Sequence, residues 1–138
     1  MASGFALAND AGSGADAGNL PSSALPLSTQ DATYFGNLTT STDEDDYYSI
    51  YIPNGTGLYA ELISPGYSGS NGTNSSSACT GATSPPCDFD LYLYDSNGAQ
   101  IDSSLDVDGY DEVTTNGTSV GGTNVTLRVT HWLSLIHI

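Results

Sequence analysis

Residues 88–98 read DFDLYLYDSNG, and this stretch decides the class of fold. Apolar residues alternate with more polar ones along it, as expected of an extended strand with one buried face. The inward set is Phe89, Leu91 and Leu93, and the outward set is Asp90, Tyr92 and Tyr94. A Ser-Asn-Gly turn signal follows and leads to a second run at 99–105. Together the two runs predict a β-hairpin.

Upstream, the sequence DYYSIYIP at residues 46–53 shows the same alternation. Its inward residues are Tyr48, Ile50 and Ile52, and its outward residues are Tyr47, Ser49 and Tyr51. The run NGTG at 54–57 is a turn signal, and LYAELIS at 58–64 resumes the alternation. These two runs predict a second hairpin.

Three further runs complete the strand pattern. Two are short, at 34–38 and 112–115, and the third is NVTLRVTHW at 124–132. The inward residues of this last run are Val125, Leu127 and Val129. Short strands separated by turn signals are typical of an antiparallel sandwich, so the sequence predicts an all-β fold of about seven or eight strands.

The 138 residues suit one domain with one core. We predict an extended N-terminal segment and an acidic, glycine-rich linker over 1–30, followed by the sandwich over 31–132. Residues 133–138 read LSLIHI, which resembles a translated adapter from DNA library preparation. No signal peptide or transmembrane run is visible, so we expect a removed signal or a fragment of a longer chain.

Charge limits the possible partners. The chain has sixteen acidic residues and one Lys or Arg, Arg128, which gives a formal net charge of -15. Nucleic acid and anionic membrane surfaces are therefore excluded as partners, because both require basic side chains. Cations are the natural partners, although the charge also serves to keep a surface protein in solution.

The two cysteines and the N-x-S/T triplets indicate a protein outside the cell. Cys79 and Cys87 lie in a long Gly/Ser/Asn/Thr loop at 65–87, and we predict a disulfide that ties this loop. Six asparagines begin glycosylation triplets: Asn37, Asn54, Asn71, Asn74, Asn116 and Asn124. Turn chemistry alone also explains three of them, Asn54, Asn71 and Asn116. We favour a glycosylated extracellular or cell-surface protein, and an archaeal surface would fit the absence of lysine.

Four segments in this order resemble the bacterial and archaeal pre-peptidase C-terminal domain. They are NDAGSGADAGN (9–19), DEDDYYSIYIPNG (43–55), DFDLYLYDSNG (88–98) and NVTLRV (124–129). The resemblance covers roughly residues 9–132 and implies a jelly-roll-like sandwich that is a non-catalytic module of secreted proteins. Relatives in bacterial collagenases bind collagen and calcium. The family has a further strand after the one similar to NVTLRV, so we expect an unpaired edge there.

Calcium is the ligand that the acidic loops favour, because it takes six to eight oxygen ligands. The N-terminal loop offers Asn9, Asp10 and Asp16, and the turn before the DYY strand holds four acidic residues that include Asp43 and Asp46. The resemblance implies that Asp10, Asp43 and Asp46 are the main ligands. The alternative is a solvated acidic turn without an ion.

A second acidic loop supplies Asp106, Asp108 and Asp111. Ser104 and Thr115 stand where an EF-hand needs its first ligand and its bidentate Glu, so that motif is rejected. A looser calcium site in this loop stays open as an alternative to solvation.

An enzyme is poorly supported, because nucleophilic catalysis needs a base beside the nucleophile. His131 is the one credible histidine, and we interpret it as a surface or edge residue. No HExxH, GxSxG or phosphate-loop motif occurs. The outward tyrosines suggest a sugar- or protein-binding surface, a subunit interface, or ordinary cross-strand packing: Tyr47, Tyr51, Tyr92 and Tyr94.

Two functions follow from these features. The first is a structural subunit of a surface filament or layer, in which residues 1–8, with Phe5 and Leu7, add as a strand to a neighbouring copy. The second is an accessory C-terminal domain of a larger secreted peptidase, which binds substrate or stabilises the enzyme. We favour the first.

Overall fold

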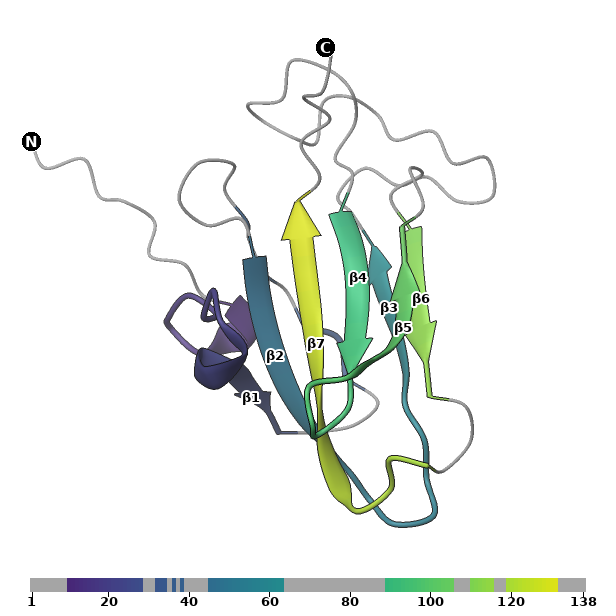
Figure 1. The fold of residues 1–138 in the computed structure, drawn as a ribbon. Coiled ribbons are helices and arrows are strands. Elements are labelled where there is room, and N and C mark those ends of the chain that lie inside the picture. The colour runs from purple at the N-terminus through teal and green to yellow at the C-terminus, as the bar shows by residue number, and fades with distance from the viewer. Residues whose placement is uncertain are drawn as a thin grey trace, which may run out of the picture.

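The computed structural model describes residues 10–28, 32–34, 36, 38, 45–63, 89–105, 110–115 and 119–131, with only the backbone of His131. Within this part, seven strands form a five-stranded and a two-stranded sheet (Figure 1). The prediction of an all-β sandwich is therefore confirmed. The elements are η1 (Asp10–Gly12), η2 (Pro21–Ser23), β1 (Leu25–Leu27), β2 (Asp45–Ile52), β3 (Tyr59–Ile63), β4 (Phe89–Tyr94), β5 (Gln100–Ser104), β6 (Tyr110–Thr114) and β7 (Thr123–His131).

The five-stranded sheet has the order β1-β2-β7-β4-β5, so β7 lies at its centre. β7 pairs antiparallel with β2 on one side and with β4 on the other (Figure 1). The expected unpaired edge next to this last strand is therefore wrong. The edge strands of this sheet are β1 and β5, and β1 departs from the antiparallel pattern because it pairs parallel to β2.

The predicted hairpin between the runs at 46–53 and 58–64 is also wrong. The turn forms, since the amide and hydroxyl of Thr56 both donate to the Pro53 carbonyl at 3.2 and 2.8 Å. However, β3 then joins the second sheet and pairs with β6. A turn signal predicts that the chain reverses, but it does not predict which sheet the next strand joins. The apolar faces of β2 and β3 are covered both in a hairpin and when β3 crosses to the second sheet.

The hairpin predicted from DFDLYLYDSNG is confirmed as β4 and β5. Asp95 holds its turn, because one carboxylate oxygen accepts the amides of Asn97 at 2.8 Å and Ala99 at 2.9 Å. Gly98 has a φ of 80°, a left-handed conformation that favours glycine.

The described part of the predicted linker, residues 10–28, packs onto the sandwich. It forms η1 and η2, buries Ala17 completely and contributes β1 to the sheet. Gly18 makes a β-bridge to Tyr47, whose amide donates to the Gly18 carbonyl at 3.1 Å. A strand was expected at 34–38, but the described residues there, Tyr34, Gly36 and Leu38, lie outside any strand. The Gly-rich, acidic composition of this segment indicated a linker. Composition does not reveal that its backbone pairs with β2.

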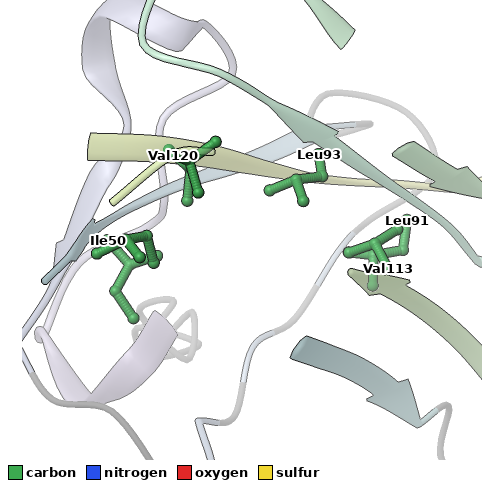
Figure 2. Close-up of a cluster of buried hydrophobic side chains, with 7 residues drawn as sticks. Ile50, Leu91, Leu93, Val113 and Val120 are labelled. Carbon is green, nitrogen blue, oxygen red and sulfur yellow. The ribbon is translucent and has the colours of Figure 1, made fainter. Parts of the chain in front are cut away.

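The core lies between the sheets, where β6 contacts β4 and β5. Figure 2 shows its buried side chains. Its buried members are Ile50, Ile52, Leu91, Leu93, Val113, Val120 and Val125. Six side chains were expected to be buried. Leu91, Leu93 and Val125 are buried, whereas the expectation is wrong for Phe89, Leu127 and Val129, which are half-buried. The alternation predicted which face turns inward, but the position of the smaller sheet decides how completely each residue is covered.

Gly122→Ala is expected to destabilise the fold more than Gly98→Ala. Both glycines have left-handed φ angles, 81° and 80°, so alanine costs about 1–2 kcal/mol at each. A Cβ at Gly122 would also overlap the Asn54 side chain, whereas nothing lies within 4 Å of the same position at Gly98. Because the exposed Asn54 side chain can rotate away, urea unfolding should give an extra loss of about 0.5–1 kcal/mol for Gly122→Ala. Equal losses for both variants would show that the Asn54 contact does not matter.

Candidate metal centre

Three carboxylates meet where the N-terminal loop lies against β2. Asp10 begins η1, Asp16 follows in the same loop, and Asp46 is the second residue of β2. One oxygen from each lies within 4.8 Å of the other two. Asp10 is 0% and Asp46 2% exposed, whereas Asp16 reaches solvent. The cluster is therefore a largely buried group of hard oxygen atoms with one open side.

The glycine-rich loop curls so that Asp10 and Asp16 face the same point. The Asp10 amide donates to the Ala15 carbonyl at 2.9 Å, and the Ser13 amide donates to the Asp10 carbonyl at 3.0 Å. Left-handed φ angles at Gly12 (72°) and Gly14 (78°) permit this tight reversal. The Ala17 amide donates to the Asp10 carboxylate at 2.9 Å, which fixes that side chain in the fold.

Tyr48 and Gly36 complete the surroundings of the carboxylates. The Tyr48 hydroxyl donates to the Asp46 carboxylate at 3.0 Å. A Cβ on Gly36 would lie 2.7 Å from this hydroxyl and 3.3 Å from an Asp10 oxygen, so only glycine fits at this close approach. Sequence reasoning missed both residues. Tyr48 had a signal, an inward tyrosine two positions after Asp46, but nothing in the pattern brought Gly36 to this place.

The chain supplies no Lys or Arg to neutralise the cluster. Arg128 is the one residue of either type, and its guanidinium pairs with Asp45 at 2.9 Å. The same group lies over the rings of Tyr47 and Tyr92, at 5.9 and 5.2 Å from their centroids. Three carboxylates this close repel one another unless protons or a cation balance them. A bound cation would reduce this repulsion.

The oxygen spacing is compatible with a bound divalent cation such as calcium. Two oxygens on one calcium ion lie at most about 5 Å apart, which is twice the usual Ca–O distance. The carboxylate oxygens of the cluster lie within 4.8 Å of one another, which falls within this range. Neither Cys nor His belongs to the cluster, and zinc or copper would favour those softer ligands. The residues present therefore fit a hard divalent cation.

The free energy of unfolding is expected to fall above about pH 10, and Tyr48→Phe should make that fall shallower. Burial raises the pKa of Tyr48, and the nearby carboxylates of Asp46 and Asp10 raise it further. As pH rises, the Tyr48 hydroxyl therefore loses its proton in the unfolded chain before it does so in the folded one. Its contribution to the free energy of unfolding is complete below about pH 10 and declines above it. Urea unfolding across the alkaline range measures the slope. Tyr51→Phe is the control, and an equal slope in wild type and Tyr48→Phe would contradict the prediction.

The predicted metal ligands do not all lie in one place in the structure. It brings together Asp10, Asp16 and Asp46, two of which the family resemblance had also implied. Asp111 is buried on β6, in the other sheet, and does not belong to this group. The remaining predicted ligands lie outside the described residues: Asn9, Asp43, Asp106 and Asp108.

Two of the predicted covalent sites belong to the part of the chain that the structure describes. Both cysteines and four of the glycosylation triplets lie outside the described residues: Cys79, Cys87, Asn37, Asn71, Asn74 and Asn116. Asn54 and Asn124 are described, and both are exposed. The described ranges contain no cysteine and hence no disulfide.

A second polar cluster lies on the exposed face of the small sheet. Glu61 and Glu112 stand directly opposite each other on β3 and β6. The Tyr59 hydroxyl lies 2.8 Å from a carboxylate oxygen of each, and the Tyr110 hydroxyl lies 2.7 Å from Glu61. Hydrogen bonds from Tyr110 and Tyr59 lower the pKa of Glu61. These bonds offset the repulsion between two like charges across the strands.

No protein-family model and no curated protein matches the chain. Among the described residues, no helix is long and apolar enough to cross a membrane.

Proposed function

We propose that the protein is a non-catalytic β-sandwich that binds calcium between its N-terminal loop and β2. The observation that carries this proposal is the Asp10, Asp16 and Asp46 cluster in a chain whose one Arg is paired with Asp45. Calcium brings a positive charge to the three carboxylates, and its Ca–O distances are compatible with oxygens that lie within 4.8 Å of one another. Backbone carbonyls and water complete its shell, as is usual for this ion.

The role of the ion is structural. The ion joins Asp46 of the five-stranded sheet to Asp10 and Asp16 of the N-terminal loop, which also contacts β2 through the Gly18–Tyr47 bridge and β1. Two of the carboxylates are buried, so a bound ion has little contact with a dissolved substrate. Binding to the folded state alone stabilises the fold by mass action.

Calorimetric titration of the full chain with calcium chloride tests the proposal. We expect saturable binding, and Asp16→Asn should weaken it at least about tenfold because a ligand charge is lost. Glu61→Gln is the matched control, since it removes an equal charge from the exposed cluster on β3 and should leave affinity unchanged. Absence of binding at millimolar calcium, or equal affinity in Asp16→Asn and wild type, would disprove the site.

We further propose an extracellular or cell-surface location. The six glycosylation triplets, the net charge of -15 and the Cys79–Cys87 pair support it. Thiol titration of the unreduced protein tests the disulfide, which would be refuted by two reactive thiols.

Within that location, we propose a structural subunit of a filament or layer built from copies of this chain. A donated strand would add at an edge strand, β1, β5, β3 or β6, since β7 has two neighbours. Electron microscopy of the purified protein should show regular fibres or sheets, and deletion of residues 1–8 should abolish them. A monomer at all concentrations would contradict the assembly.

The alternative proposal is an accessory domain of a larger secreted peptidase. The segments that resemble the pre-peptidase C-terminal domain favour it. A peptidase domain in the same continuous reading frame would establish this role, and a frame without one would exclude it.

A further inference from the structure

The two described glycosylation triplets occupy different surroundings. Asn54 lies in the turn after β2, and its side-chain oxygen packs where a Cβ of Gly122 would stand. This asparagine therefore serves the contact between two turns. Asn124 is the second residue of β7 and is exposed, and its side chain makes no hydrogen bond with any described residue. Both described amides are exposed, and that of Asn124 lies on a strand, where the β2–β7 register fixes its neighbour.

Tyr51 stands directly across from Asn124 in the β2–β7 ladder. It belongs to the outward face of β2 and is 53% exposed. The Cβ atoms of directly opposed residues in an antiparallel pair lie about 4.5–5.5 Å apart. Val125 is buried on the other face of β7, so Asn124 projects to the same side as Tyr51. An exposed aromatic ring therefore lies beside the exposed amide.

We propose that Asn124 carries an N-linked oligosaccharide whose first sugar stacks on the ring of Tyr51. This inference rests on the proposed extracellular, glycosylated state and specifies one site of it. The side-chain nitrogen forms a bond to the anomeric carbon of a lipid-linked oligosaccharide phosphate. The bond from that carbon to the phosphate oxygen breaks, the lipid phosphate leaves, and the amide nitrogen loses one proton to solvent. Thr126 supplies the hydroxyl of the triplet.

The stacking follows from the position of the sugar. The first ring is attached directly to the amide nitrogen, so it begins next to the cross-strand neighbour. One face of a pyranose presents C–H groups, which pack on an aromatic face and remove apolar surface from water. Without the sugar, about half of the Tyr51 surface stays exposed to solvent. The glycan therefore stabilises the folded state and covers this end of the five-stranded sheet.

A double-mutant cycle on the full chain, secreted from a host that performs N-glycosylation, tests the inference. The four proteins are wild type, Asn124→Gln, Tyr51→Ser and the double variant. Peptide mass spectrometry should find oligosaccharide on Asn124, and Asn124→Gln should lower the melting temperature by about 2–6 °C when Tyr51 is present. In the Tyr51→Ser background the same change should have no effect. Tyr51→Phe should restore the effect, because it keeps the ring.

Tyr59→Ser is the matched control, since Tyr59 is a similarly exposed strand tyrosine on the other sheet. It should leave the effect of Asn124→Gln unchanged. An unmodified Asn124 would overturn the inference, and so would an effect of Asn124→Gln that is equal with and without Tyr51. Neither result bears on calcium binding, which the titration tests separately.

Discussion

Chelating calcium is expected to lower the melting temperature of this protein by about 10 °C. An ion present at 100 times its dissociation constant stabilises the folded state by about 2.7 kcal/mol. For a chain of this size, each kcal/mol corresponds to about 3–4 °C. Removal of the ion also leaves the carboxylates of Asp10, Asp16 and Asp46 within 4.8 Å of one another, where they repel more strongly. Thermal unfolding in excess calcium and in excess chelator measures the difference.

The effect of Asp16→Asn on the melting temperature should have opposite signs in excess calcium and in excess chelator. In calcium, the variant has lost a ligand charge, so it should melt below wild type. In chelator, it has lost one of three repelling charges, so it should melt a few degrees above wild type. Asp16 is the suitable position because it is exposed, whereas Asp10 and Asp46 are buried in the fold.

The control for this experiment is Glu61→Gln, which removes a repelling charge from the exposed Glu61–Glu112 pair on the other sheet. Its melting temperature should respond to calcium as wild type does. A wild-type melting curve that is identical in calcium and chelator would rule out a stabilising ion. The same shift in Asp16→Asn and wild type would place the ion elsewhere.

Leu93→Ala is expected to cost about 3–5 kcal/mol, the largest effect of any single substitution considered for this protein. Leu93 is fully buried on β4, opposite Leu127 of β7, and belongs to the cluster between the sheets (Figure 2). Truncation removes buried methyl groups and leaves a cavity that rigid strands on both sides cannot close. Urea unfolding monitored by circular dichroism gives the free energy.

Ile101→Ala provides the comparison, because Ile101 lies on the adjacent strand β5 and is 38% exposed. Its substitution should cost less than about 1.5 kcal/mol. Equal losses at the two positions would mean that Leu93 does not lie in the interior of the sandwich.

The local pattern determined the strands and their inward faces. Period-two alternation placed Tyr48, Ile50 and Ile52 inward on β2, and the structure buries all three. The Asp95–Gly98 turn was also predictable from the sequence. The hydrogen bonds to the Asp95 carboxylate and the left-handed φ of Gly98 all fall within five consecutive residues. Local geometry of this kind is encoded in neighbouring residues, so the sequence alone predicts it.

The sequence also indicated Asp10, Asp16 and Asp46 as candidate ligands. It did not predict which of the candidate ligands lie close together in the fold. Asp46 is thirty or more residues away from the loop that holds the other two, so their approach depends on how that loop docks on β2. Gly36, which faces the same carboxylates, has no local signal at all. Proximity between distant segments is a property of the assembled fold.

Strand order was likewise decided only by the tertiary structure. The alternation in β7 is compatible with an edge or a central position, yet β7 lies between β2 and β4. The apolar run after the Asn54–Gly57 turn fits a hairpin or a crossing to the second sheet, and it crosses. Backbone hydrogen bonds are the same for any partner strand, so pairing is selected by how completely the whole arrangement covers the apolar faces.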